Sequence, residues 1–195
     1  QWTWFVPHDV DGLVELMGGR DAFIGKLDSL FTADSKLEGE STSVDISGLI
    51  GQYAHGNEPS HHIAHLYNYV GQPWRTQEIV DEVLHTLYFN NPDGLSGNED
   101  CGQMSAWYIL NAMGFYQVCP GKPVYSIGRP LFNEATVHLK DGKSFKVIAH
   151  NNSRDNKYVQ SIVLNGNKLE TPFFTHQDIV DGGTLELTMG SEPLK

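Results

Sequence analysis

Apolar residues recur at helical spacing through the first 115 residues of the chain. Val10, Leu13, Val14 and Met17 follow the i, i+3, i+4, i+7 pattern of one helix face, and Gly18 ends that pattern. The same spacing predicts further helices over about residues 23–31, 63–70, 73–87 and 102–113. The last of these is apolar almost all round, so we expect it to be buried.

The pattern changes after Pro120 to short runs rich in β-branched and aromatic residues, over residues 124–127, 135–139, 145–148, 158–164 and 185–189. Pairs such as Asp141-Gly142 and Asn165-Gly166 separate these runs and are typical of hairpin turns. This half is predicted to form a small antiparallel sheet or sandwich. We therefore expect a helical unit over residues 1–118 and a β unit over residues 119–195.

The chain carries a formal net charge of −11 and contains no basic run. Nucleic acids and anionic membrane surfaces attract proteins with basic patches, so this charge argues against both as partners. It fits a neutral ligand such as a sugar. No stretch approaches the roughly 20 apolar residues of a membrane-spanning helix.

The chain begins with Gln1 and not with Met, so we expect it to be a processed or truncated piece of a longer protein. Its two cysteines, Cys101 and Cys119, flank the helix predicted over residues 102–113. Their placement near opposite ends of a helix favours free thiols, with a disulfide as the alternative. Two cysteines do not assign a redox compartment.

Two acidic segments, residues 55–62 and 97–105, each contain glycine and lead directly into a predicted helix. Helices that pack up and down alternate in direction, so those beginning near residues 9, 60 and 102 should begin at one end of the layer. The two acidic segments would then share a rim with residues 2–9. Carboxylates, histidines and tryptophans would meet there. This combination suits a sugar, whose apolar face stacks on indole rings and whose hydroxyls bind carboxylates.

The carboxylates and histidines of these two segments also have simpler interpretations. A carboxylate at a helix N-terminus is commonly a cap that accepts from free N–H groups, and this reading applies to Glu58 and Asp100 taken singly. His61 and His65 have the i, i+4 spacing of zinc-binding helices, but no HExxH motif and no third ligand at a usual spacing accompany them. Zinc binding by this pair stays an alternative.

Several motifs, in order along the chain, carry a resemblance to a known family. They are Trp4–Asp9 (WFVPHD), Gly56–His61 (GNEPSH), Tyr67–Gly71 (YNYVG), Gly97–Ala106 (GNEDCGQMSA) and Gly114–Tyr116 (GFY). In these residues the sequence resembles glycoside hydrolase family 92, the calcium-dependent exo-acting α-mannosidases. The resemblance is strongest from residue 1 to about residue 130.

The resemblance implies a fold in which an N-terminal β-sandwich precedes an (α/α)6 barrel and a small C-terminal β-domain. This chain would hold the C-terminal part of the catalytic barrel, over residues 1–118, and the β-domain, over residues 119–195. The expected fold class is then α+β, with partial (α/α)6-barrel helices followed by a small antiparallel β-sandwich. The N-terminal remainder of the same enzyme would be the partner that completes the pocket.

The resemblance also implies the chemistry. Members of the family remove terminal α-mannosides from mannose-containing glycans with inversion, and we expect α-1,2 linkages in particular. Inversion needs one carboxylic acid to protonate the leaving oxygen and one carboxylate to activate water. On the family pattern Glu58 matches the acid and Asp100 matches the base. Asn98 stands where some members have an additional Asp.

The same resemblance implies ligands for the substrate and for a metal ion. Substrate contacts are expected from Trp4, His8, Asp9 and His61. Calcium binds six to eight oxygen ligands, and its candidate protein ligands here are Asn57, Asn98 and Glu99. A cation close to Glu58 would favour the charged form of that carboxyl, so we expect calcium on the opposite side of the sugar, held largely by substrate hydroxyls.

Two competing functions remain from the sequence alone. In the first, the chain is a non-catalytic carbohydrate-binding or structural module, in which the carboxylates are helix caps. In the second, it is a zinc hydrolase with His61 and His65 on the metal. A role in glycan degradation favours a periplasmic or secreted location, whereas the sequence does not fix the linkage preference or the oligomeric state.

Overall fold

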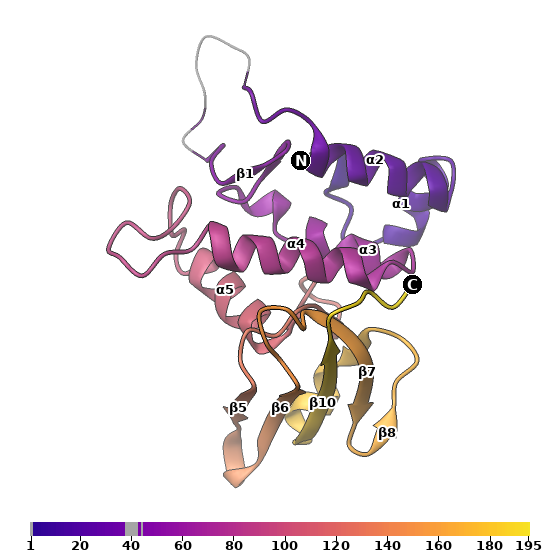
Figure 1. The fold of residues 1–195 in the computed structure, drawn as a ribbon, viewed down its shortest axis with the longest axis vertical. Helices are drawn as coiled ribbons and strands as arrows, with labels where there is room; N and C mark the ends of the chain where they lie inside the picture. The colour runs from indigo at the N-terminus through magenta and orange to yellow at the C-terminus, as the bar shows by residue number, and fades with distance from the viewer. Residues whose placement is uncertain (1, 38–42, 44) are drawn as a thin grey trace.

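The computed structural model describes residues 2–37, 43 and 45–195. It places the helices in an upper layer and the strands of the second half of the chain below them (Figure 1). The α-helices of this layer are α1 (Val10–Leu16), α2 (Arg20–Thr32), α3 (Leu66–Tyr69), α4 (Pro73–Thr86) and α5 (Gln103–Met113). Short 3-10 helices are η1 (Trp2–Trp4), η2 (Glu58–Ser60) and η3 (Ile63–His65). A small hairpin pairs β1 (Leu49–Ile50) with β2 (Tyr53–Ala54).

The helix predicted over residues 63–70 has a different form. This segment continues from η2 as a second 3-10 turn, η3, that leads into the single α-helical turn α3. Its backbone bonds have the tight i→i+3 spacing of 3-10 structure, as in the bond of 3.0 Å from His65 N to His62 O. Every side chain from residue 60 to residue 68 is buried. The apolar spacing in the sequence predicted an α-helix with one buried face. Because every side chain of this segment is packed, the segment adopts 3-10 turns instead.

Helix α5 is buried on one face only. Met104 and Trp107 are fully buried, whereas Ile109 is 55% exposed. The expectation of a helix buried all round is therefore wrong for its outer face. On that side Ile109 lines an open cleft of about 640 Å³ together with Phe89 and Tyr108.

The second half of the chain forms two sheets. The larger has the strand order β5 (Glu134–His138), β6 (Ser144–His150), β10 (Gly183–Gly190), β7 (Tyr158–Leu164) and β8 (Asn167–Lys168), as Figure 1 shows. The smaller has the order β3 (Phe115–Tyr116), β4 (Val124–Ile127) and β9 (Phe173–Thr175). Strand β10 runs antiparallel to β7 but parallel to β6, because it inserts between two strands of opposite direction. At this one pairing the sheet departs from the expected antiparallel arrangement.

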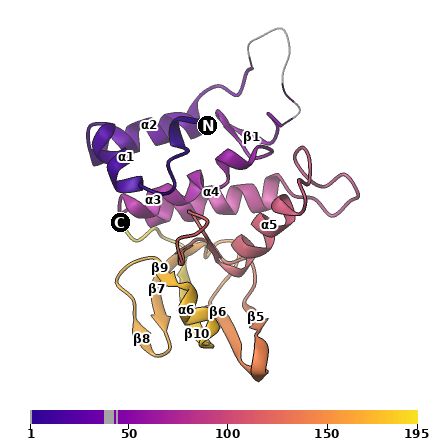
Figure 2. The ribbon, with the colours of Figure 1, turned by 180° about the vertical axis from the view of Figure 1, so that it is seen from behind.

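The two sheets enclose one hydrophobic core, which confirms the α+β class and the predicted sandwich. Phe145 and Leu185 reach this core from the larger sheet, and Ile127 and Phe174 reach it from the smaller. The rings of Phe145 and Phe174 stack with centroids 5.8 Å apart. Helix α6 (His176–Val180) lies against this sandwich on the side seen in Figure 2. The 3-10 turn η4 (Lys140–Gly142) connects β5 to β6.

A buried ion pair joins the helices to the sandwich. Arg129 follows β4 and is 2% exposed, and its Nε lies 3.0 Å from Asp81 Oδ1 on α4. The other guanidinium nitrogens donate to the carbonyl oxygens of Pro130 and Ser153. Burial lowers the pKa of Arg129, and the Asp81 charge opposes this shift. This ion pair holds α4 over the sandwich together with two hydrogen bonds from β7, from the Tyr158 hydroxyl to Glu78 and from Val159 N to Gln77.

Three expectations concern the chain as a whole. Among residues 2–37, 43 and 45–195, no helix combines the length and the apolar character that a membrane span requires. Cys101 and Cys119 are free thiols, so the alternative of a disulfide is not realised. The division between residues 118 and 119 stays a prediction, and strand β3 before it pairs with strand β4 after it.

Replacing Arg129 by Met should destabilise the chain by about 3 kcal/mol, because Asp81 would lose the buried charge that it faces. Lys146→Met is the matched control. Its bridge to Glu134 is 2.9 Å long but 38% and 55% exposed at the two side chains, so its loss should cost less than about 1 kcal/mol. Urea unfolding of both variants measures the difference, and equal losses would contradict a special role for Arg129.

Candidate active site

A cleft of about 430 Å³ opens between η2 and the start of α5. It is lined by Phe5, Pro7, Glu58, Pro59, His61, His62, Gln103, Tyr116, Gln117, Val118 and Pro120. The larger cleft beside the outer face of α5 has no carboxylate or histidine in its wall. A third cleft, of about 490 Å³, has Glu78, Asp81, Glu82 and His85 in its wall but no residue of either acidic segment.

The cleft of about 430 Å³ combines a titratable carboxyl, Glu58, with residues of both acidic segments. Acid–base chemistry needs such groups, so this cleft is the candidate site.

The two predicted catalytic carboxyls meet beside this cleft. Glu58 lies in η2, and Asp100 is exposed on the loop before α5. The pKa of Asp100 is raised, first by the neighbouring Glu58 side chain and then by desolvation and the Glu58 charge, whereas His61 opposes the shift. The two carboxyls therefore lie close enough to influence each other, and this nearness does not by itself distinguish the acid from the base.

The loop that presents Asp100 has an unusual backbone. Asp100 and Cys101 have φ angles of 49° and 55°, and Gly102 follows with 94°. Left-handed backbone is unfavourable for residues other than glycine and often marks functional loops. The preceding Glu99 caps α5, because its two carboxylate oxygens accept from Ser105 N at 3.1 Å and Ser105 Oγ at 3.0 Å. Asp100 is consequently not needed as a cap.

His61 lies in the wall of the cleft and is neutral. Its Nε2 is 2.9 Å from the carbonyl oxygen of His55, which can only accept, so Nε2 carries the hydrogen. Its Nδ1 is 3.0 Å from Gln103 Nε2 and accepts from it. Burial lowers the pKa of His61 to about 4, although the bond to the His55 carbonyl opposes the shift.

His65 does not share a ligand position with His61. Its Nε2 bonds Asn111 Oδ1 at 2.8 Å, and its Nδ1 bonds Ser126 Oγ at 3.0 Å. Burial lowers its pKa to about 4, and the bond to Asn111 opposes the shift. Because all four ring nitrogens of His61 and His65 make hydrogen bonds within the chain, the structure gives the zinc alternative no support.

Residues 2–9 reach the rim, but not through the side chains that the sequence suggested. Trp4 is 3% exposed and packs edge-on against Phe23 with ring centroids 5.2 Å apart. The expectation that Trp4 offers a ring to the sugar is therefore corrected, since Trp4 belongs to the helical core. Asp9 Oδ1 accepts from Gly12 N at 3.0 Å and caps α1. The backbone oxygen of His8 accepts from Lys122 Nζ.

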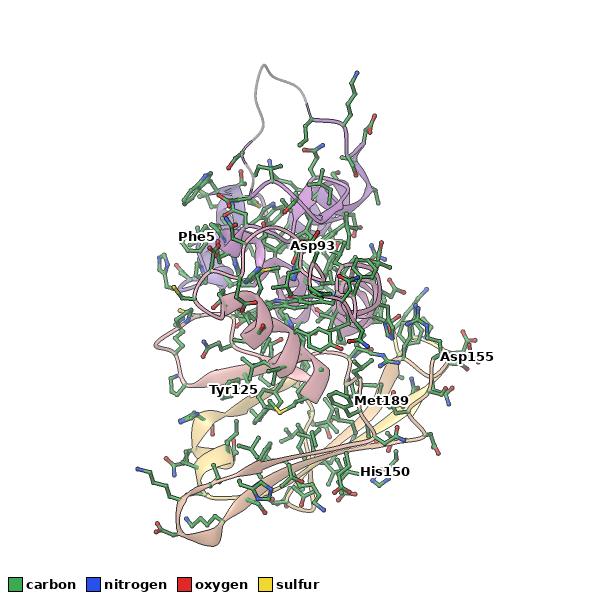
Figure 3. All side chains as sticks on the ribbon, turned by 90° about the vertical axis from the view of Figure 1, so that its left-hand side faces the viewer. Phe5, Asp93, Tyr125, His150, Asp155 and Met189 are labelled. Carbon is green, nitrogen blue, oxygen red and sulfur yellow. The ribbon has the colours of Figure 1, made fainter. Side chains whose placement is uncertain are left out.

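Neither His8 nor Asp9 is in the wall of the cleft, which the segment lines instead with Phe5 and Pro7. Phe5 is 46% exposed and lies at the margin of the helical part in Figure 3. Among the predicted substrate contacts only His61 is in the wall. Gln103 and Tyr116 were missed as site residues, although both lie within the motifs that carry the family resemblance. Membership of a motif was the only signal for them.

The candidate calcium ligands offer oxygen atoms that suit this ion, but too few of them. Asn98 Nδ2 donates to Asp45 Oδ1 at 3.2 Å, Glu99 caps α5, and Asn57 precedes η2. Among the described residues no group of three or more His, Cys, Asp or Glu side chains is placed to hold a metal ion. Calcium takes six to eight oxygens, so substrate, water or other parts of the protein would have to supply most of them.

The sequence model of the glycosyl hydrolase family 92 catalytic domain matches residues 1–191. This chain belongs to glycosyl hydrolase family 92. The resemblance carried by the motifs is thereby confirmed, and the two acidic loops are those of a family 92 catalytic domain.

Solved structures agree with the family assignment. A family GH92 α-mannosidase from Bacteroides thetaiotaomicron, solved in complex with mannoimidazole, is 43% identical with a TM-score of 0.92, covering 98% of this chain and 25% of that chain. A family GH92 inverting mannosidase from strain VPI-5482 of the same organism is 45% identical with a TM-score of 0.84, covering 98% of this chain and 27% of that chain. An uncharacterized secreted glycosidase of Arthroderma benhamiae is 32% identical over 97% of this chain and 23% of its own length. The chain thus spans about a quarter of these relatives.

Acid should destabilise this family 92 chain through its buried histidines. His61 and His65 have folded pKa values of about 4, below the usual 6.5. The unfolded chain therefore binds more protons below pH 6.5, and stability that is fully present above that pH is lost as the pH falls toward 4. Each group contributes a slope of about 1.4 kcal/mol per pH unit in this window.

Chemical denaturation at about pH 7, 6 and 5 measures this slope. His65→Gln should reduce it, whereas His138→Gln, at an exposed position on β5, removes no buried imidazole and serves as the control. An unfolding free energy that stays constant between about pH 7 and pH 5 would contradict the lowered pKa values, because the folded and unfolded chains would then bind equal numbers of protons.

Proposed function

We propose that the protein containing this chain hydrolyses terminal α-mannosides, including α-1,2-linked ones, in mannose-containing glycans. Membership of family 92 supports this proposal, as do two solved relatives that are described as mannosidases. The observation that carries it is the meeting of Glu58 and Asp100 beside a cleft of about 430 Å³. Two carboxyl groups at one cleft are the basic requirement of most glycoside hydrolases.

In the proposed reaction, Glu58 donates a proton to the oxygen of the departing sugar or alcohol as the glycosidic bond breaks. Asp100 removes a proton from a water molecule, and that water attacks the anomeric carbon from the opposite face. The product then has the inverted configuration. A 45% identical relative that is described as an inverting mannosidase supports this stereochemistry.

The proposed roles need space between the two carboxyls, because an inverting pair stands ~6.5–9.5 Å apart so that a water molecule fits. Asp100 is exposed on its loop, whereas Glu58 lies in η2 next to the buried Ser60 and His61. The Asp100 side chain is therefore the member of the pair that can adjust its position as the sugar and water enter.

Calcium is proposed as the cofactor, with Asn57, Asn98 and Glu99 as candidate ligands from this chain. A hard cation would hold neighbouring hydroxyl oxygens of the mannose ring. The amide and carboxylate oxygens of these three residues are the ligand type that calcium prefers. Asn98 and Glu99 already make hydrogen bonds to Asp45 and Ser105, so they would bind the ion through remaining lone pairs.

The N-terminal remainder of the same enzyme is the proposed partner of this chain. The chain spans about a quarter of its relatives. The cleft beside α5 leaves apolar side chains open, with Ile109 of α5 55% exposed and Phe89, from the segment after α4, 59% exposed. Further helices of the same polypeptide would bury that face. A periplasmic or secreted location is proposed because the curated relative is described as secreted.

A non-catalytic carbohydrate-binding or structural module is the second candidate. It is favoured by two carboxylates of the motifs, Asp9 and Glu99, which act as helix caps, and by the chain's span of about a quarter of its relatives. Calorimetric titration of the chain with mannose, beside a turnover assay of the full-length protein, separates the two. Binding without turnover in the full-length protein would establish the module.

The acid and base roles predict different responses to the leaving group. In the full-length enzyme, Glu58→Gln should abolish most activity on natural mannosides, whose leaving alcohols need a proton, and should retain much more on aryl mannosides with acidic leaving groups. Asp100→Asn should lose activity on both, because water is not activated. Glu82→Gln, on the exposed side of α4, is the control. Equal losses of Glu58→Gln on the two substrate types would remove its assignment as the acid.

Removal of calcium should abolish turnover by the full-length enzyme, and added calcium should restore it better than zinc. The reason is that the candidate ligands are oxygen atoms, whereas the nitrogens of His61 and His65 are occupied within the chain. Activity is measured after chelation and after addition of each ion in turn. Full activity after exhaustive chelation, or rescue by zinc alone, would overturn this cofactor.

A further inference from the structure

The Gln103 side chain has a fixed orientation in the wall of the cleft. His61 Nε2 donates to the His55 carbonyl, so the Nδ1 atom of the neutral ring can only accept. The group 3.0 Å from Nδ1 must therefore be a donor, and this assigns it as the amide nitrogen of Gln103. The assignment follows from hydrogen-bond chemistry and does not depend on distinguishing the nitrogen from the oxygen by shape.

The second hydrogen of the same amide nitrogen points to Tyr116. Gln103 Nε2 lies 3.2 Å from the Tyr116 hydroxyl oxygen, which accepts from it. Burial raises the pKa of Tyr116 to about 12, although the bond from Gln103 opposes the shift, so the phenol keeps its own hydrogen at neutral pH. Both donors of the amide are thus used, one on His61 and one on Tyr116.

Two polar atoms of Gln103 and Tyr116 take no part in these hydrogen bonds. Among the residues that the structure describes, the Gln103 carbonyl oxygen has no donor and the Tyr116 hydroxyl hydrogen has no acceptor. Both side chains line the cleft that Glu58 lines, and Tyr116 is only 7% exposed. Gln103 is half-buried, so its carbonyl oxygen and the Tyr116 hydroxyl hydrogen are one acceptor and one donor available to a ligand on this side of the cleft.

We propose that Gln103 and Tyr116 form a hydroxyl-recognition pair, in which the Gln103 carbonyl oxygen accepts from, and the Tyr116 hydroxyl donates to, the hydroxyl groups of the sugar bound beside Glu58. A sugar hydroxyl both donates and accepts, so it matches this acceptor and donor. His61 acts as a positioning residue, because its tautomer determines which end of the Gln103 amide faces the ligand. The inference rests on the proposed mannosidase function and adds a specificity element to it.

The test uses the full-length enzyme and a set of monodeoxy α-mannosides, each lacking one hydroxyl. Tyr116→Phe removes one donor and keeps the ring, and it should lower kcat/KM roughly tenfold on the complete substrate, mainly through KM. The deoxy substrate that lacks the recognised hydroxyl should lose activity with the parent enzyme but little more with the variant. Gln103→Met should show the same coupling. Tyr125→Phe removes a hydroxyl in the same sheet that bonds His176, away from the cleft, and should leave all ratios unchanged.

The coupling between protein and substrate hydroxyls distinguishes recognition from a structural effect, which would lower activity equally on every substrate. Equal losses on all the deoxy substrates, or no loss in Tyr116→Phe, would overturn the recognition pair and leave the mannosidase proposal standing. A parent enzyme that turns over no α-mannoside would instead remove the proposed function, and the recognition pair would fall with it.

Discussion

The relative position of the two acidic loops depends on His61. One ring nitrogen donates to the His55 carbonyl in its own loop, and the other accepts from Gln103 at the start of α5. The backbone oxygen of His61 also accepts from Trp107 Nε1 at 2.9 Å, one helical turn further along α5. This set of bonds requires a neutral imidazole with its hydrogen on Nε2. Burial ensures that state, and the loop of Glu58 is thereby fastened to the helix that follows Asp100.

Glu58 and Asp100 remain available for chemistry because other carboxylates cap the helices near them. Asp9 caps α1 and Glu99 caps α5, so the free N–H groups at those helix ends are satisfied by residues outside the pair. Asp100 and Cys101 then adopt left-handed backbone before the helix begins. Such strain is tolerated where the surrounding structure fixes the loop. Glu99 therefore caps α5, while the adjacent Asp100 directs its carboxyl group toward Glu58.

The sequence predicted the local structure better than the site. Helices α1, α2, α4 and α5 follow the 3.6-residue pattern, because local spacing decides them. Gly18 follows the end of α1 and Gly114 caps α5, as their positions in the sequence predict. The meeting of the acidic loops was predicted from helix directions, yet the segment after Glu58 is a run of 3-10 turns. The loops meet because His61 bonds Gln103, 42 positions away. A contact between residues so far apart in the chain cannot be predicted from the spacing of apolar residues.

The same limit applies to Trp4, which precedes α1 and has no repeat to show which way its ring faces. Its burial against Phe23 depends on packing with α2. Gln103 illustrates the reverse case: as the first residue of α5 it looks like an ordinary polar helix start, and only the tautomer of a distant histidine shows which of its atoms faces the cleft. Site residues that act through such relays cannot be predicted from spacing.

Helix α5 connects the geometry of the cleft to the surface that the remaining part of the enzyme is proposed to cover. Its first residue, Gln103, faces the cleft, while Ile109 is 55% exposed on the opposite side. A helix is stiff along its axis, so packing against Ile109 would also restrict the loop that carries Asp100. The pKa of Asp100 is raised first by the neighbouring Glu58 side chain, so the two loops bring these carboxyls within reach of each other. The same loops are joined by the bond between His61 and Gln103, and both of these side chains line the cleft. The position of the carboxyl pair and the shape of the cleft wall therefore depend on one set of hydrogen bonds.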